Sequence, residues 1–495
     1  MTASLEMRNL AAKYYLTMFQ RPHFIIISVF LMAVAYSPIQ QKKKNVLFII
    51  ADDLNDNIGS YGHYLAKTPN IDRLAEEGML FNQAFCNFPL CGPSRASMMT
   101  GLYPDQTGHH KLRDLIRDHV PDVVTMSQSF MKEGYTSARV GKIYHYNNPN
   151  GIGTPGHDDS LSWHERYYPS GIDREIEDKI FSLSPGHFGA TLSWLAAEGA
   201  DEEHTDGMVA TQAIDLLKRY KAEDTPFFLG VGFYKPHTPF VAPAKYFEMY
   251  DKKDIQVPQI PDNYFETIPE PAVKTLTRWG VQNDLSDSLA RSAIHAYYST
   301  ISFLDTQVGR VLQALDELGM KENTLIVFTS DHGYHMGEHA YYQKKTLFEL
   351  SGKIPLIVYD PSMQGKGAVT SGIVEMIDLY PTICDLAGVP SPEYLAGKSF
   401  AKTLDDPTWR TRESALTQID ASNGYTIRTS DFRFTQWNEG GEGMIELYDR
   451  RSDPEEMKNL AGDAAYKEKI DELSGLLQRR IDEANVPPAG LKVIK

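Results

Sequence analysis

Asn45-Val-Leu-Phe-Ile-Ile-Ala51 is a continuous apolar run that ends in two adjacent carboxylates, Asp52 and Asp53. An apolar run without alternation is typical of a strand that is covered on both faces, as in a parallel sheet between helices. Two carboxylates at the end of a buried strand are costly to bury unless positive charge meets them. The stretch therefore predicts an α/β sheet with an acidic site at a strand end.

A second acidic strand end lies far away in the sequence. Apolar residues at helical spacing from Ile294 to Leu318 predict a helix with one buried stripe, closed by Gly319. Thr324 to Thr329 then form another buried strand, which ends in Ser330-Asp331-His332-Gly333. Ligand sites in open α/β sheets collect at the carboxyl ends of strands, where both clusters are expected.

Further apolar runs alternate with amphipathic helices. The runs are Tyr135–Val140, Pro226–Gly232 and Ile354–Tyr359, and another helix is predicted from Glu375 to Leu386. This alternation predicts an α/β fold in which a large mixed, mainly parallel sheet is sandwiched by helices. We assign this domain to residues 44–395.

The pattern of predicted secondary structure changes after about residue 395. Short strand-like segments, such as Tyr425–Arg428 and Phe432–Trp437, precede an amphipathic helix from Ala464 to Glu483. They predict a smaller C-terminal α+β domain with an antiparallel sheet over residues 396–495. The irregular region from Asn147 to Ser170 is long enough for a substrate-binding loop, and an idle surface loop fits it equally well.

Composition restricts the class of protein. The 495 residues carry 49 Lys and Arg against 65 Asp and Glu, a formal net charge of −16, which argues against a nucleic-acid partner. An anionic substrate would need a local basic pocket. Three cysteines, Cys86, Cys91 and Cys384, exclude a disulfide framework and a C-x-x-C metal site. Cys86 and Cys384 are expected in the core or as a fortuitous pair.

The N-terminus carries an apolar run from Phe24 to Ala35, preceded by Arg21 and ending in a small-x-small triplet. Its length fits the apolar part of a secretory signal better than a membrane span. We predict a signal peptide over residues 1–37, with Met18 as an alternative start, and a periplasmic or secreted protein without a stable membrane span after cleavage. An N-terminal membrane anchor is the competing interpretation.

Cys91-Gly92-Pro93-Ser94-Arg95 has the features of a helix start. Pro93 suits the first helical position, which would put Cys91 at or just before the helix N-terminus. Unpaired N–H groups and partial positive charge at that end suit an anionic group. Arg95 lies one turn on from Cys91 and can face the same ligand.

Together, these motifs resemble the formylglycine-dependent sulfatase family of the alkaline phosphatase superfamily, from Asn45 almost to the C-terminus. Glu446-Leu-Tyr-Asp449 is similar to the C-terminal signature of the family. Gly141–His145, Lys235–Phe240 and Ser330–Tyr334 most resemble the iduronate-2-sulfatase branch, in which His332 stands where many sulfatases have Asn. The resemblance implies an alkaline-phosphatase-like fold and a carbohydrate sulfatase.

By resemblance, one divalent cation is held by four side chains and an oxygen of the modified Cys91. The four are Asp52, Asp53, Asp331 and His332. Three carboxylates make a hard site, so Ca²⁺ is the first choice and Mg²⁺ the second. A maturation enzyme would oxidise Cys91 to formylglycine, whose hydrate attacks the sulfate ester.

The resemblance also assigns catalytic roles. Arg95, Lys142 and Lys344 would neutralise sulfuryl charge, with Lys345 as the alternative to Lys344. His237 would protonate the leaving oxygen, and His145 would act as the base that releases sulfate from the sulfated hydrate.

These assignments predict an exported sulfatase. Its substrate would be a sulfated oligo- or polysaccharide, such as ulvan or carrageenan fragments of algal origin, or a glycosaminoglycan. Two alternatives are a phosphonate or phosphate ester hydrolase of the same superfamily and a catalytically silent carbohydrate-binding relative.

Overall fold

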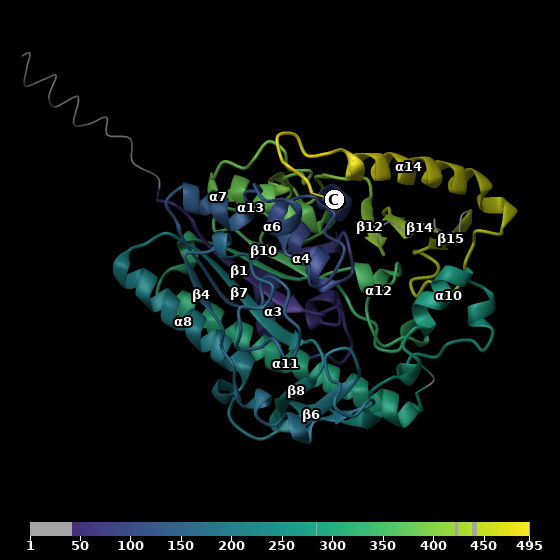
Figure 1. Cartoon of the computed structure of the whole chain (residues 1–495), viewed down its shortest axis with the longest axis horizontal. Helices are drawn as coiled ribbons and strands as arrows, with labels where there is room; N and C mark the ends of the chain where they lie inside the picture. The colour runs from purple at the N-terminus through teal and green to yellow at the C-terminus, as the bar shows by residue number, and fades with distance from the viewer. Residues whose placement is uncertain (1–41, 284, 421–423, 438–442, 495) are drawn as a thin grey trace, which may run out of the picture. The chain divides into compact units, whose positions relative to one another are not determined.

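A large mixed sheet is the centre of the computed structural model, which describes residues 42–283, 285–420, 424–437 and 443–494 (Figure 1). In that part of the chain, five of its seven strand pairings are parallel, and β10 pairs antiparallel with both of its neighbours. In sheet order, the strands are β11 (Ala368–Glu375), β2 (Met79–Phe85), β10 (Leu356–Tyr359), β9 (Thr324–Ser330), β1 (Asn45–Asp52), β7 (Phe227–Pro236), β3 (Thr136–Gly141) and β4 (Glu165–Tyr167).

Strand β1 is buried along its whole length because both faces of the sheet are covered. Leu47, Ile49 and Ala51 pack into one apolar cluster, with α3 (Pro69–Glu77), α8 (Thr205–Glu223) and α11 (Asp287–Glu317). Val46, Phe48 and Ile50 pack into the other, with α4 (Cys91–Thr100), α7 (Met126–Lys132) and α13 (Leu379–Ala387). Figure 1 shows α8 and α11 on the opposite side of the sheet from α7 and α13. The predicted α/β architecture is therefore confirmed.

A second, antiparallel sheet follows in the C-terminal part. It contains β12 (Ala415–Ile419), β13 (Gly424–Arg428), β14 (Phe432–Trp437) and β15 (Met444–Asp449) in sequential order. Leu473 and Leu477 of α14 (Lys467–Asn485) join its apolar cluster. The predicted α+β character is confirmed.

The remaining elements are short. β5 (Phe181–Ser182), β6 (Ser193–Ala197) and β8 (Phe240–Pro243) form a small sheet. The short helices are α5 (Pro104–Thr107), α6 (Ile116–His119), α9 (Ala244–Phe247), α10 (Glu270–Thr277) and α12 (Glu349–Gly352).

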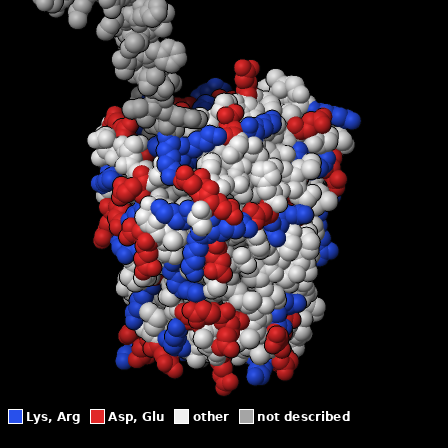
Figure 2. Space-filling view, turned by 90° about the vertical axis from the view of Figure 1, so that its left-hand side faces the viewer, with Lys and Arg blue, Asp and Glu red and all other residues white. Residues whose placement is uncertain are grey.

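Residues 44–495 form one compact unit, so the proposed boundary at residue 395 stays a prediction. The proposed signal peptide, residues 1–37, lies outside the described residues. Among the described residues, no helix has the length and apolarity needed to cross a bilayer. Figure 2 shows acidic and basic side chains interspersed over the face that it draws, rather than a field of one sign.

Several helix starts differ from the sequence predictions. Helix α4 begins at Cys91, so Pro93 is its third residue, where a missing N–H is also harmless. Helix α11 begins at Asp287 instead of Ile294, because Ser286 caps it. Glu375 ends strand β11 and is followed by a 3₁₀ turn, so α13 begins only at Leu379. Helix α14 likewise begins at Lys467, after a 3₁₀ turn from Ala464.

Candidate active site

The two acidic strand ends meet because β1 and β9 are parallel neighbours, with Ala51 paired to Ser330. Carboxylate oxygens of Asp52, Asp53 and Asp331 lie within 4.8 Å of one another and are buried. The Asp53 backbone N–H donates to Asp331 Oδ1 at 3.2 Å. Asp53 itself adopts φ 66°, a left-handed conformation that is uncommon outside glycine and that Asp tolerates better than most residues.

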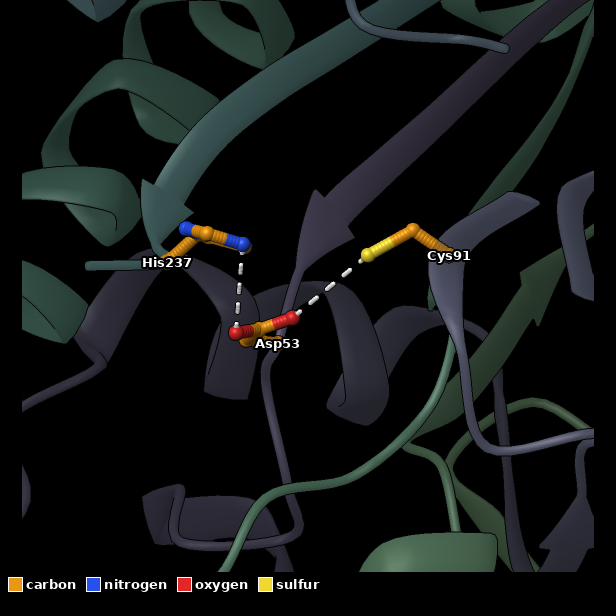
Figure 3. A group of neighbouring side chains, drawn as sticks. All are labelled: Asp53, Cys91 and His237. Atoms are coloured by element: carbon orange, nitrogen blue, oxygen red, sulfur yellow. Dashed lines mark hydrogen bonds and ion pairs between the residues drawn. The ribbon is translucent and has the colours of Figure 1, made fainter. Parts of the chain in front are cut away.

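Cys91 faces this acidic centre from the first turn of α4. Its Sγ lies 3.2 Å from His332 Nε2, 3.4 Å from Lys344 Nζ and 3.9 Å from Asp53 Oδ1. In Figure 3 the carboxylate of Asp53 lies between Cys91 and His237. Burial raises the pKa of the Cys91 thiol well above its usual value, and a neutral thiol is a poor nucleophile.

Arg95 and Lys142 pair with the acidic residues from within the core. Lys142 Nζ contacts Asp52 Oδ2 at 2.5 Å, and Arg95 contacts Asp331 at 2.9 Å and Asp52 at 3.2 Å. The other Arg95 contacts are backbone carbonyls, and its side chain is fully buried. Both cations therefore hold the carboxylates in place.

Nearby positive charge offsets the cost of burial more fully for Asp52 than for Asp53. Burial opposes ionisation of Asp52, but Lys142, His237 and Arg95 outweigh it and hold its pKa well below the usual range. For Asp53, burial raises the pKa to about 7, with repulsion from Asp52 and Asp331 added and Lys344 opposing. Asp53 Oδ2 has no hydrogen-bond partner among the described residues.

Three histidines surround this centre. His237 follows β7; its Nδ1 is assigned as donor to the Thr238 carbonyl at 2.5 Å, which leaves Nε2 facing Asp53 Oδ2 at 3.7 Å. His332 Nδ1 similarly bonds the Gly333 carbonyl, so its Nε2 faces Cys91. His145 Nε2 lies 3.4 Å from Asn147 Oδ1, and burial lowers the pKa of His145 to about 2.

A pocket of about 820 Å³ opens onto four of the predicted catalytic side chains. These are Cys91, His145, His237 and Lys344. Arg95, Lys142 and the three aspartates of the acidic centre do not line it, and all five are buried.

Comparisons with known proteins agree with this geometry. The family model for sulfatases matches residues 44–389, more than half of the chain. The chain belongs to the sulfatase family. A model for the C-terminal part of N-sulphoglucosamine sulphohydrolase matches residues 337–483.

Two relatives and one solved structure illustrate the likeness. A sulfatase of Formosa agariphila is 32% identical over 455 residues, 88% of this chain and 87% of that protein. Human iduronate 2-sulfatase is 30% identical over 507 residues, 85% of this chain and 91% of that protein. The structure of a phosphonate monoester hydrolase of Agrobacterium radiobacter, 23% identical, has a TM-score of 0.76 and covers 92% of this chain and 100% of that chain. This last likeness shows the fold alone, and the chain itself is a sulfuric ester hydrolase.

The two adjacent lysines of this sulfatase lie in different places. Lys344 Nζ contacts Asp53 Oδ1 at 2.5 Å, beside Cys91. Lys345 has φ 71°, and its ammonium pairs with Asp420 instead. The expectation that Lys344 enters the site agrees with this placement. Cys86 and Cys384 are free, buried thiols, so they belong to the core and do not pair.

Two contacts of the acidic centre were not predicted. Asn148 Nδ2 donates to Asp52 Oδ2 at 2.9 Å, and Asn148 also lines the pocket. Asn148 belongs to the irregular region from Asn147 to Ser170. The length and position of that region were the sequence features that pointed to a role in the site. Tyr297 of α11 donates to the Asp53 carbonyl at 2.8 Å. Its place in an apolar helical stripe gave no sign of this contact.

Proposed function

We propose that this protein is an exported carbohydrate sulfatase that uses a formylglycine made from Cys91 and one divalent cation. The observation that carries the proposal is the position of Cys91, at the deep end of a saccharide-sized pocket and beside three buried carboxylates. The proposal has four parts: the cation, the maturation of Cys91, the proton transfers and the substrate.

The acidic centre fits a hard cation. Asp53 Oδ2 is buried without a hydrogen-bond partner among the described residues, and burial, with repulsion from Asp52 and Asp331, raises the pKa of Asp53 to about 7 although Lys344 opposes it. Asp52, Asp53, Asp331 and His332 would hold the ion, with Ca²⁺ as the first choice and Mg²⁺ as the second. Once bound, the cation would neutralise charge on the sulfuryl oxygens.

Cys91 needs modification to act. Its buried thiol stays protonated near neutral pH, because burial raises its pKa well above the usual value. A maturation enzyme that converts it to formylglycine would supply a hydrate hydroxyl as the nucleophile. The N-terminus of α4 at Cys91 then stabilises the negative charge of the sulfuryl group.

Proton transfer falls to the two histidines that line the pocket. His237 donates from Nδ1 to the Thr238 carbonyl and presents Nε2 to the site. Burial and the charge of Lys344 hold the pKa of His237 well below its usual value, so Nε2 must first take up a proton, beside the bound anionic substrate, before His237 can pass it to the leaving oxygen. Burial lowers the pKa of His145 to about 2, so His145 is neutral at pH 7 and a weak base. The negative charge of the bound sulfuryl group must raise this pKa before His145 can accept a proton in the release step. Lys344 stabilises negative charge next to Cys91 and assists His237.

The substrate is a sulfated saccharide, of algal polysaccharide or glycosaminoglycan origin. The name of the human relative, iduronate 2-sulfatase, supports the saccharide class. Export to the periplasm or beyond rests on the apolar run from Phe24 to Ala35 in the proposed signal peptide.

The test is release of sulfate from defined ulvan, carrageenan and glycosaminoglycan oligosaccharides by protein purified from cells that make formylglycine. Phosphate monoesters, diesters and phosphonate esters are assayed beside them, with Cys91→Ala as the inactive control. We expect sulfate release to dominate. Faster hydrolysis of a phosphorus ester would instead favour the phosphohydrolase alternative, and saccharide binding without any hydrolysis would favour a silent relative.

A further inference from the structure

The mouth of the active-site pocket is basic in an otherwise acidic protein. Exposure rises from Cys91 and Lys344, which are 1% and 8% exposed, to the exposed Arg113 and Arg278, so the arginines mark the mouth. Among the described residues, the charged side chains that line the pocket are Arg113, Arg278, Lys344, Lys345 and Glu177. Lys344, Lys345 and Glu177 pair with Asp53, Asp420 and Arg174, so Arg113 and Arg278 are the lining charges without an ion pair in the described part of the chain. Charges farther than about 8 Å are largely screened at physiological ionic strength, so a bound ligand feels these cations more than the net charge of −16.

Arg278 is fixed directly over the backbone of the catalytic lysine. Its Nε and Nη2 bind the Tyr341 hydroxyl at 3.1 and 3.0 Å, and Nη2 also binds the carbonyls of Lys344 and Lys345 at 2.9 and 3.0 Å. Nη1 has no hydrogen-bond partner among the described residues and is free for a ligand. Arg278 and Cys91 are therefore connected through one residue, Lys344, whose carbonyl binds the guanidinium and whose Nζ lies 3.4 Å from Cys91 Sγ.

Arg113 and Trp279 complete the mouth. Arg113 is exposed, lines the pocket and makes no ion pair with any residue in the described ranges. Trp279, next to Arg278, is 38% exposed and offers an indole surface to the pocket. An aromatic face covers the C–H side of a sugar ring, while the arginine beside it accepts an anionic substituent of that ring.

We propose that this mouth is a subsite for a second anionic group, so the substrate is a saccharide with a carboxylate or a further sulfate in addition to the sulfate that is cleaved. Arg278 and Arg113 bind that group, and Trp279 stacks on the sugar that bears it. The proposal rests on the carbohydrate sulfatase function proposed above and narrows it to polyanionic saccharides.

The experiment compares three matched sulfated disaccharides that differ only in the substituent facing away from the cleaved ester: a carboxylate, a second sulfate or a neutral hydroxymethyl group. We expect kcat/KM to be about 10- to 100-fold higher for at least one dianionic member than for the neutral one, the size of one charge-assisted contact. Whether the carboxylate or the sulfate gives the larger gain identifies the group. Equal values for all three would overturn the proposal while leaving sulfatase activity intact, whereas no sulfate release from any would count against the proposed function itself.

Variants then assign the preference to residues. Arg113→Gln should reduce the ratio of the dianionic to the neutral kcat/KM about 10-fold, and the ratio in Arg113→Lys should fall less. Lys111→Gln removes an equal charge nearby, from a residue that does not line the pocket, and should leave the ratio unchanged. If Arg113→Gln and Lys111→Gln lowered this ratio equally, the preference would come from long-range electrostatic attraction, and the proposed subsite would be wrong. Raised salt should lower the wild-type ratio, because the contact is partly exposed.

Discussion

Two buried clusters in this sulfatase pair carboxylates with cations, and they differ in how far those cations offset the burial of each carboxylate. Where the C-terminal sheet meets the catalytic part, Glu375 accepts from Tyr103 and Arg480 at 2.7 Å each, and Asp378 binds Arg412 at 2.6 and 2.7 Å. Although burial opposes it, Arg412 and Arg480 lower the pKa of Glu375. In the active site, one oxygen of Asp53 pairs with Lys344, but the other has no hydrogen-bond partner among the described residues, and the pKa of Asp53 is raised to about 7, chiefly by burial.

This difference in charge compensation distinguishes a cluster that stabilises the fold from a cluster suited to binding a cation. A buried carboxylate with cations on its oxygens resists disruption, because removing either partner leaves an uncompensated charge. A buried carboxylate that keeps one oxygen without a partner gains from a further positive charge, which a divalent cation provides. We therefore expect variants of the first cluster to lose stability and variants of the second to lose activity.

The largest effect is expected for Cys91→Ala. Without a formylglycine precursor, sulfate release should fall to the reagent blank, while the melting temperature stays within the range of surface variants because only one buried atom is removed. Peptide mass analysis of the active wild type should find the aldehyde at Cys91 and unmodified thiols at Cys86 and Cys384. Full activity in protein whose Cys91 is wholly unmodified would contradict the mechanism.

His237→Ala tests whether the active-site cluster also supplies a proton. Loss of a positioned acid should lower kcat about 10²- to 10⁴-fold for unactivated sugar sulfates, and much less for an aryl sulfate whose phenolate leaves unaided. The Lys142→Met variant is the matched control. Lys142 acts on charge at the sulfuryl group and the metal site, which both substrates share, so kcat should fall by the same factor for the sugar sulfate and the aryl sulfate. Equal losses across leaving groups in His237→Ala would make His237 a binding residue and favour Lys344 as the proton donor.

Much of this comparison could be predicted from the sequence, because strand ends and motif spacing are local features. The runs before Asp52 and before Asp331 placed both acidic groups at one sheet edge, where they lie. Arg95 could not be placed in the same way, because its partners are side chains and carbonyls from three other segments. The basic mouth was also hidden, since Arg113, Arg278 and Lys345 come together only through the tertiary fold.

Arg412→Met is expected to show the cost of breaking the compensated cluster. Glu375 and Asp378 would lose a buried partner, which should lower the free energy of unfolding by about 3–5 kcal/mol. Urea denaturation with and without a metal chelator measures this loss.

The matched variant Asp53→Asn should lose metal content and activity together, with a smaller loss of stability in chelator. Wild-type activity that survives complete metal removal would exclude the proposed cation, and a larger stability loss in Asp53→Asn would break the comparison.

The smallest effect concerns Glu446, a buried carboxylate whose hydrogen bonds come from neutral donors, Trp437 Nε1 and the Tyr448 hydroxyl, each at 2.7 Å. Burial raises the pKa of Glu446 from 4.5 to about 7. Between these pH values the unfolded chain loses a proton that the folded protein keeps, so the stability of the folded state falls as pH rises, by on the order of 3 kcal/mol in total. Glu446→Gln removes this titration, and the difference in unfolding free energy between variant and wild type should therefore grow in favour of the variant from pH 4.5 to pH 7 and stay constant above. Chemical denaturation across that range measures the difference. If this difference did not change with pH, two neutral donors would be enough to keep a buried carboxylate ionised. Cationic partners would then no longer distinguish the structural cluster around Glu375 from the active-site cluster.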